Sequence, residues 1–250
     1  MTYEEAVKRI YHLSQITKNQ DIYGTCKAIA GGIFCPAHGV AFAAPYIRDA
    51  AIVVVGMAEC TWYAKNTGVY YAQHTADERF YSCVLEEDIA LGFGEQLVGQ
   101  IAQVVEQTHC ACVILASTCI PEIIGEDIEQ AALQAEQQCG CPVLLIHTSH
   151  FDYKCYEYEI AVLLSLGKLM QPQPIKPGSV NYLGVELHFQ HQQAAENELT
   201  RLLKEHGVST NLILLNSCTT EEIKKAPAAQ LNIVTHRVGL PLAKWMEQAF

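Results

Sequence analysis

Basic residues are scarce in this chain, and so are long apolar runs. Its 250 residues include 16 Lys and Arg against 27 Asp and Glu, which gives a net charge of −11. Nucleic acids are bound through clustered Lys and Arg, so this balance argues against a nucleic-acid partner. The longest uncharged apolar run, residues 50–58, is far shorter than the ~18 residues of a membrane span, and residues 1–10 show no apolar signal-peptide core. We therefore expect a soluble, cytoplasmic protein with no membrane partner.

Two motifs are also missing. No Cys-x-x-Cys pair occurs, which argues against a zinc ribbon and a thioredoxin-type dithiol, and the four-cysteine ferredoxin run is absent as well. No Gly-x-x-x-x-Gly-Lys-Ser/Thr motif occurs, so the chain is not itself a P-loop ATPase. Charged residues make up only 17% of the chain and hydrophobic residues 50%, which argues against extended disorder and is enough to bury a substantial core.

Cysteine, by contrast, is abundant. The chain has 11 cysteines, an odd number. A chain of this size without an export signal does not need disulfides to fold, so the thiols are either buried small side chains or ligands. A single cysteine packs more often than it binds, and its position must therefore identify the exceptions.

The hydrophobic pattern predicts alternating strands and helices. A capping box at residues 2–5 precedes apolar residues at helical spacing and predicts a first amphipathic helix. Apolar runs of strand length follow at residues 51–56, 111–117 and 143–147, and helix-period segments lie at about 96–107, 127–138 and 156–168. This alternation predicts a parallel sheet with right-handed crossovers.

A proline-rich segment separates a second unit. Three prolines within residues 171–178 cannot continue a helix. After them, strands at 180–185, 208–215 and 232–235 alternate with helices at 191–206, 220–225 and about 240–250. The expected fold is α/β with two Rossmann-like parallel-sheet domains: a first domain at residues 1–170, a Pro-rich linker at 171–179, and a second domain at 180–250 that is either small or truncated.

Three cysteines stand where a parallel sheet binds ligands. Such sheets bind at the carboxyl ends of their strands. Cys60 lies four residues after the strand at 51–56, and Cys119 directly follows the strand at 111–117. Cys35 lies in a Gly-rich loop, where glycines allow the backbone to approach a bulky ligand closely. Three thiols from separate loops at one edge of a sheet suit a metal-cluster site.

Four other cysteines belong to the opposite edge. Cys110 and Cys112 flank a single residue at a strand entrance, and Cys139 and Cys141 precede the next strand. We interpret all four as packing residues.

Five segments of the sequence are informative together: Cys-Pro-Ala-His-Gly at 35–39, Ile-Arg-Asp-Ala at 47–50, Val-Gly-Met-Ala-Glu-Cys at 55–60, Glu-Glu-Asp-Ile-Ala-Leu-Gly at 86–92 and Ser-Thr-Cys-Ile-Pro-Glu-Ile-Ile-Gly-Glu-Asp-Ile at 117–128. These segments resemble the nitrogenase component 1 family, which comprises the molybdenum-iron protein subunits, their cofactor-assembly paralogues and the nitrogenase-like tetrapyrrole reductases. The resemblance covers essentially the whole chain, and the spacings of 25 and 59 residues between the three cysteines fit it.

The resemblance implies that Cys35, Cys60 and Cys119 are ligands of an iron-sulfur cluster at a subunit interface. A cluster needs about four ligands, so the remaining ones must come from a second chain or from a non-cysteine residue. We therefore expect a homo- or heterodimer through the cluster face. Two identical chains would offer six thiolates, which suits an eight-iron, P-cluster-like centre, whereas a 4Fe–4S cluster would leave some thiolates unused; both stay open. The resemblance further implies anaerobic chemistry, with a P-loop ATPase iron protein as electron donor and a small-molecule substrate.

Other residues follow as second-rank candidates. Cys83 lies before an acidic segment, and His150 and Cys155 follow the third strand near where a family partner offers a ligand, so all three are metal or cluster-adjacent candidates. His236 and Arg237 stand where the nitrogenase alpha subunit has its cofactor cysteine, and they are candidates for binding substrate. Because that cysteine and the family's third domain are absent, dinitrogen reduction is not predicted.

Three functions remain open at this point. The first is a nitrogenase-like oxidoreductase subunit that takes electrons from an ATP-dependent iron protein through the cluster to a small reducible substrate, such as a tetrapyrrole. The second is a scaffold that carries or matures a cluster or cofactor without turnover. The third is a non-redox binding module, in which the two sheets close on a small ligand and the cysteines are merely buried.

Overall fold

The computed structural model describes residues 35–72, 79–84, 92–148, 155–183, 192–214, 216–234 and 236–250. The predicted N-terminal helix with its capping box lies outside these residues. The chain divides into two units, Met1–Phe34 and Cys35–Phe250, and every described residue belongs to the second unit. Among the described helices, none combines the length and the apolar character needed to cross a bilayer.

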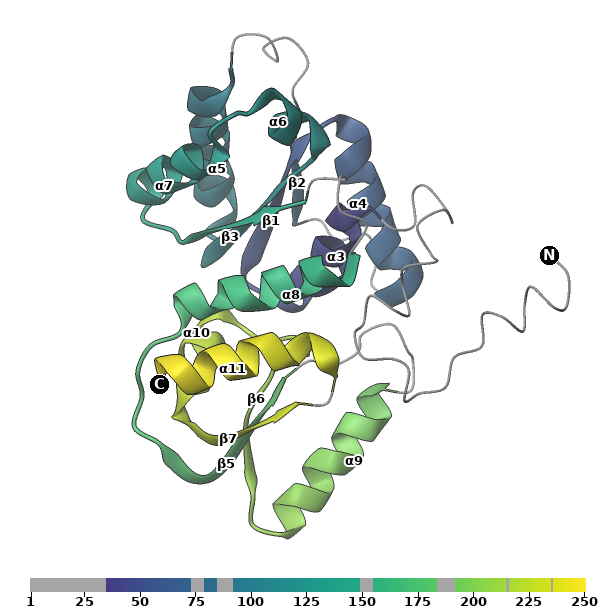
Figure 1. Cartoon of the computed structure of the whole chain (residues 1–250), viewed down its shortest axis with the longest axis vertical. Coiled ribbons are helices and arrows are strands. Elements are labelled where there is room, and N and C mark those ends of the chain that lie inside the picture. The colour runs from purple at the N-terminus through teal and green to yellow at the C-terminus, as the bar shows by residue number, and fades with distance from the viewer. Residues whose placement is uncertain are drawn as a thin grey trace, which may run out of the picture. The chain divides into compact units, whose positions relative to one another are not determined.

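The first half of the described chain forms a four-stranded parallel sheet in the order β2-β1-β3-β4 (Figure 1). Its elements are α3 (Pro36–Ala43), β1 (Ala50–Gly56), α4 (Ala58–Ala72), β2 (Phe80–Val84), α5 (Gly94–Thr108), β3 (Cys112–Ser117), α6 (Cys119–Ile124), α7 (Ile128–Cys139), β4 (Val143–His147) and α8 (Cys155–Ser165). The connections from β1 and from β3 run in opposite directions, so the topological switch point lies between these two strands.

Helices cover both faces of this sheet. Along β1, Ile52 and Val54 pack into one core cluster and Val53 and Val55 into another, because successive side chains point to opposite faces. The first cluster draws on α3 and α8, and the second on α5 and α7. Burial on both faces explains why β1 is an uninterrupted apolar run rather than an alternating one.

The second half forms a three-stranded parallel sheet in the order β6-β5-β7. Its elements are β5 (Lys176–Leu183), α9 (Gln192–Glu205), β6 (Ser209–Ile213), α10 (Thr220–Lys224), β7 (Ala229–Val234) and α11 (Leu240–Ala249). The helix α10 begins with a capping box, in which Thr219 and Glu222 satisfy each other's backbone N–H groups. The predicted α/β class with two parallel sheets is therefore confirmed.

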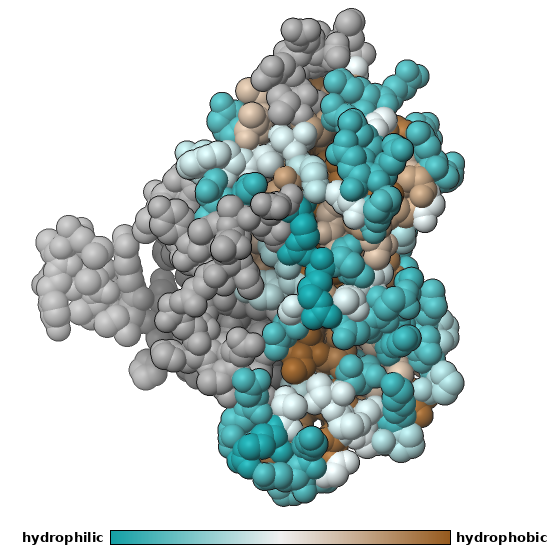
Figure 2. Space-filling model, turned by 180° about the vertical axis from the view of Figure 1, so that it is seen from behind, coloured by the Kyte–Doolittle hydropathy of each residue, from teal (hydrophilic) through white to brown (hydrophobic). Residues whose placement is uncertain are grey.

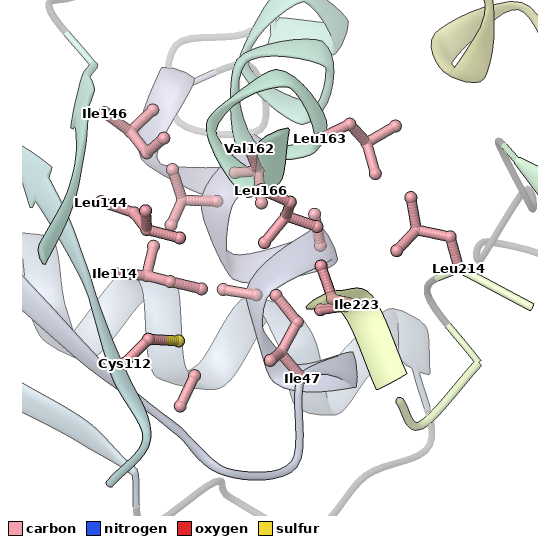
Figure 3. Packing of buried hydrophobic residues seen from close by; sticks show 14 of the residues in the cluster. Ile47, Cys112, Ile114, Leu144, Ile146, Val162, Leu163, Leu166, Leu214 and Ile223 are labelled. Carbon is pink, nitrogen blue, oxygen red and sulfur yellow. The ribbon is translucent and has the colours of Figure 1, made fainter. Parts of the chain in front are cut away.

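The two sheets share one apolar core. The first core cluster contains Ile114 and Leu144 from the four-stranded sheet, and Leu214 and Ile223 from the second half of the chain (Figure 3). Backbone hydrogen bonds join the halves as well, because Cys218 bonds to the segment at 46–48 from both its N–H and its carbonyl group. The segment at 47–50, which carried part of the family resemblance, thus links the two sheets.

Some elements were not predicted. The strand β2 lies at the edge of its sheet, and the polar or partly exposed Tyr81 and Ser82 stand between the buried Phe80 and Cys83, so it lacks the apolar run that marked the other strands. The helices α3, α4 and α6 show little apolar periodicity or are short. The domain division at 171–179 stays a prediction, and β5 begins inside that segment, at Lys176.

The described surface is largely polar. On the face shown in Figure 2, hydrophilic side chains predominate and hydrophobic areas are small. Several of the large apolar side chains that stay exposed belong to α4 and α6, the helices that follow β1 and β3.

Candidate metal centre

The three predicted ligands lie at the N-terminal ends of three helices. Cys35 caps the N-terminus of α3, Cys60 lies in the first turn of α4, and Cys119 is the first residue of α6. The expectation that Cys60 and Cys119 lie in loops was wrong, because α4 begins two residues before Cys60 and α6 begins at Cys119; Cys35 lies outside a helix, directly before α3. All three thiols are partly exposed.

The sheet topology explains why two of these cysteines meet. Cys60 follows β1 and Cys119 follows β3, and these neighbouring strands flank the switch point of the sheet. At a switch point the outgoing connections diverge and leave a crevice at the carboxyl ends of the strands. Both thiols therefore reach the same crevice from its two sides.

A close contact fixes the spacing of these two segments. Thr118 donates its backbone N–H and its hydroxyl to the carbonyl of Val55, at 3.1 and 2.7 Å. This draws the Thr118 side chain against Gly56, where an added Cβ would lie 1.9 Å from Thr118 Oγ1. Gly56 also has φ +153°, which side-chain-bearing residues rarely adopt. Only glycine fits at this position.

Cys35 directly precedes α3, and α3 packs against α4, which carries Cys60. Burial raises the pKa of the Cys35 thiol above its ordinary value, although a hydrogen bond from the backbone of Ala37 lowers it. Negative charge on Cys119 or on Cys60 raises that pKa further. Cys35 and Cys119 are 84 residues apart in the sequence, yet charge on Cys119 affects the ionisation of the Cys35 thiol.

The geometry does not suit a single metal ion. Among the residues the structure describes, no three Cys, His, Asp or Glu side chains converge tightly enough to hold one ion. An iron-sulfur cluster poses a different requirement, because each thiolate binds a different iron atom and the ligand sulfurs are spread around the cluster.

Exposed apolar side chains lie on the same helices as Cys60 and Cys119. Trp62 and Tyr63 on α4 are 62% and 55% exposed, and Ile123 on α6 is 64% exposed. The two aromatic rings contact each other edge to face, with centroids 5.3 Å apart. Large apolar groups that stay exposed beside one another are characteristic of interaction surfaces.

A polar network that sequence reasoning missed lies beside Cys119. The Glu122 carboxylate accepts a hydrogen bond from the buried Ser117 hydroxyl and lies 2.7 Å from Nδ1 of His147. The other ring nitrogen of His147 is 3.5 Å from Glu129. Ser117 and His147 end neighbouring strands in register, so pairing the predicted strands β3 and β4 would have placed them together.

Of the three second-rank metal candidates, the structure describes the side chain of Cys83 alone. Cys83 is buried in β2 within the second core cluster, and burial raises its pKa to about 11, which favours a packing role. His150 lies outside the described residues. Cys155 begins α8, and its side chain lies outside the described part of the chain.

The substrate candidates lie in the second sheet. His236 and Arg237 follow β7, at the carboxyl end of the strand, and lead through a short turn into α11. His236 is partly buried and Arg237 is exposed. The strands β5 and β7 form the switch point of this sheet, so these two residues stand beside its crevice.

Two open grooves lie away from the three cysteines. One, of ≈ 570 Å³, runs along the edge strand β4 and is lined by Leu133, Leu164 and Trp245 among others. The other, also ≈ 570 Å³, lies at the start of α5, where the Glu126 carboxylate accepts the Gly94 N–H at 3.0 Å. Neither includes Cys35, Cys60 or Cys119.

Comparison with known proteins gives a consistent result. The family model of nitrogenase component 1 type oxidoreductases matches residues 35–250. The light-independent protochlorophyllide reductase subunit from Picosynechococcus sp. is 28% identical over 174 residues, which are 65% of this chain and 34% of the relative. The corresponding subunit from Synechocystis sp. is 28% identical over 181 residues, 68% of this chain and 35% of the relative.

A solved structure supports the fold. Nitrogenase Cp1 at pH 5 superposes with a TM-score of 0.70 and 22% identity, covering 88% of this chain and 47% of that chain. The present chain thus spans about a third of the length of these curated relatives and about half of the solved chain. Because the family model covers most of the sequence, from Cys35 to the last residue, the chain belongs to the nitrogenase component 1 type oxidoreductase family.

Proposed function

We propose that Cys35, Cys60 and Cys119 hold an iron-sulfur cluster and that this chain is the cluster-carrying part of a nitrogenase-like reductase component. The observation that carries the proposal is the placement of the three cysteines: Cys60 and Cys119 follow the two strands at the switch point, and Cys35 directly precedes α3, which packs against α4. Iron in such clusters takes thiolate ligands, and a coordinated thiol is deprotonated even where burial opposes ionisation. The donor set therefore fits the group.

The chain's own residues hold and enclose the site. When bound, the cluster supplies one-electron transfer at a potential set by ligation, burial and hydrogen bonds to sulfur. The contact between Gly56 and Thr118 keeps the Cys60 and Cys119 segments in register. Cys60 packs against the first core cluster, so apolar side chains keep water from the inner side of the site.

A second chain completes the ligand set. Three thiols are fewer than the about four ligands that a cluster takes, and all three cysteines are partly exposed, so a ligand from a partner chain can reach the site. The exposed Trp62, Tyr63 and Ile123 supply apolar contact area next to Cys60 and Cys119. A homo- or heterodimer through this cluster face is the assembly we infer.

The electron donor and the substrate follow from the same proposal. A separate P-loop ATPase iron protein supplies electrons, since these 250 residues contain no P-loop motif. The substrate is a small reducible molecule, and the names of the cyanobacterial relatives make a tetrapyrrole the first one to test. His236 and Arg237 can donate hydrogen bonds to an anionic group of such a substrate.

Anaerobic purification with replacement of single cysteines tests the cluster. We expect broad visible absorption and bound iron and sulfide in the wild type, and loss of most of the iron in Cys35→Ala, Cys60→Ala and Cys119→Ala. Cys139→Ala is a matched control, because Cys139 is also partly exposed but lies at the opposite edge of the sheet. Equal iron loss in all four variants, or no iron in the wild type, would refute the site and favour the non-redox binding module.

A second experiment separates the reductase from the assembly scaffold. The iron-loaded protein is mixed with a P-loop iron protein, and its visible spectrum is followed with ATP and with a non-hydrolysable ATP analogue. A reductase component is reduced only when ATP is hydrolysed. A scaffold stays oxidised and instead transfers iron to an apo-acceptor protein, a result that would replace the reductase proposal.

A further inference from the structure

A second group of thiols lies at the opposite edge of the four-stranded sheet. Cys110 and Cys112 stand at the start of β3, and Cys139 and Cys141 precede β4. In the parallel register Val113 pairs with Val143. Continued two residues toward the N-terminus of each strand, this register places residue 111 opposite Cys141, and Cys110 is the residue before it. Neighbouring strands are about 4.8 Å apart, which is within the ~4.4–6.8 Å between Cα atoms that a disulfide spans.

Side-chain contacts single out two of these four thiols. Cys141 Sγ lies 3.5 Å from the carbonyl oxygen of Cys110. The ionisations of the two thiols are also linked, because each thiol shifts the pKa of the other. Cys139 instead donates to the carbonyl of Ala135, at 2.8 Å, on its own helix. Cys112 is fully buried, and burial raises its pKa to about 12, so it stays a protonated packing residue.

We propose that Cys110 and Cys141 form a redox-active dithiol, which closes to a disulfide when it meets a low-molecular-weight disulfide. Cys110 is partly exposed and is the thiol that an oxidant reaches, whereas Cys141 is buried. The pair is independent of the iron-sulfur proposal, because neither residue is among the three ligands and the two sites lie at opposite ends of the strands.

The chemistry of the pair fits this division of roles. The hydrogen bond from the Cys141 thiol lowers the pKa of Cys110 to about 6, although burial opposes the shift. The same interaction raises the pKa of Cys141, so the two sulfurs share one proton near neutral pH. A thiolate with a pKa close to the ambient pH is the most effective attacking group in thiol–disulfide exchange.

The exchange balances in two steps. The Cys110 thiolate attacks one sulfur of the small disulfide, breaks its S–S bond and releases one thiolate, leaving a mixed disulfide on Cys110. The negative charge beside Cys141 is then gone, so Cys141 can ionise, and its proton passes to the released thiolate. The Cys141 thiolate attacks Cys110 Sγ and expels the second small thiolate. Two protein thiols lose two electrons, and the small disulfide becomes one thiol and one thiolate.

Glutathione disulfide and a Glu-specific protease test the pair in the full chain. Cleavage after Glu106, Glu122, Glu136 and Glu157 puts Cys110 and Cys141 on different peptides. After exposure to glutathione disulfide and blocking of free thiols, we expect a disulfide-linked pair of peptides, 107–122 with 137–157, in mass spectra. Cys112→Ala and Cys139→Ala should keep this link.

Variants of Cys110 and Cys141 distinguish the thiol that attacks the small disulfide from the thiol that then attacks Cys110. Cys110→Ala should abolish the link, and Cys141→Ala should instead accumulate glutathione on Cys110, because no second thiol displaces it. Circular dichroism checks that each variant folds, and the wild-type peptide link is a test that needs no variant. Absence of the link in the wild type, its persistence in Cys110→Ala or Cys141→Ala, or its loss in Cys139→Ala would overturn the proposal.

Discussion

Asp49 and Thr220 are 171 residues apart in sequence, yet the Asp49 carboxylate accepts the Thr220 backbone N–H at 2.9 Å and the Thr220 hydroxyl at 3.0 Å. Thr220 is the first residue of α10 and is fully buried. Asp49 directly precedes β1. One carboxylate therefore ties the helix α10 of the second sheet to the strand that leads to Cys60.

Removal of this carboxylate should weaken the joint between the sheets. Asp49→Ala leaves a buried N–H and a buried hydroxyl without their acceptor, which we expect to cost about 1.5–3 kcal/mol in the free energy of unfolding. Urea denaturation measures this cost. Arg48→Ala is the control, because the exposed Arg48 contacts Ser217 and Glu222 only at 3.3 and 3.5 Å and should cost under about 1 kcal/mol. Equal costs for the two variants would contradict the role given to Asp49.

Gly56→Ala should damage both stability and the metal centre. The new methyl group would overlap Thr118 Oγ1, and the backbone would keep a conformation that alanine disfavours. We expect a loss of about 2–4 kcal/mol in urea denaturation, together with reduced iron content. Gly99→Ala is a matched control in α5, where nothing lies within 4 Å of the added Cβ, and it should stabilise slightly. A Gly56→Ala protein with wild-type iron would show that this contact does not position Cys60 and Cys119.

The reactivity of Cys110 should depend on pH in a defined way. Because its pKa is lowered to about 6, the thiolate fraction rises as the pH increases through that value and is nearly complete at neutral pH. The rate of iodoacetamide labelling of Cys110 is measured by peptide mass spectrometry at a series of pH values. It should reach half of its maximum near pH 6. In Cys141→Ala the midpoint should move upward, since the donor that stabilises the thiolate is gone. An unchanged midpoint would assign the shift to another group.

The metal and the association of chains should be linked. A group that binds only the assembled state stabilises it by mass action, so chelation of iron should shift the protein toward monomer in sedimentation. Trp62→Ser should weaken association without removing a ligand, because Trp62 is exposed next to Cys60. A monomer that retains its full iron would refute an interface at the cluster face.

His236→Ala should leave the iron content unchanged. A single imidazole is a poor anchor for soft iron-sulfide, and His236 belongs to the other sheet from the three thiols. The comparison is iron per dimer in the wild type and in the variant. A drop of several irons would reveal a second metal centre, whereas weaker binding of an anionic substrate with unchanged iron would support the role proposed for His236.

The sequence alone determined the class of fold and the positions in it of the cysteines that we propose as ligands. Uninterrupted apolar runs of this length are typical of strands buried on both faces, and strands that alternate with helices pair in parallel. The runs at β1 and β3 therefore placed Cys60 and Cys119 at the carboxyl edge, whereas Cys110 and Cys141 fell at the opposite edge. These are local properties, because each depends on a few adjacent residues.

The tertiary structure decided which distant side chains meet. Pairing of β3 with β4 brings Ser117, Glu122 and His147 together and sets Cys141 against Cys110, neither of which follows from residue spacing within one segment. The helix α4 has little hydrophobic periodicity, and its packing against β1 and β2 stabilises it instead. Such contacts depend on the order and register of strands far apart in the chain, and these are fixed only when the whole core packs.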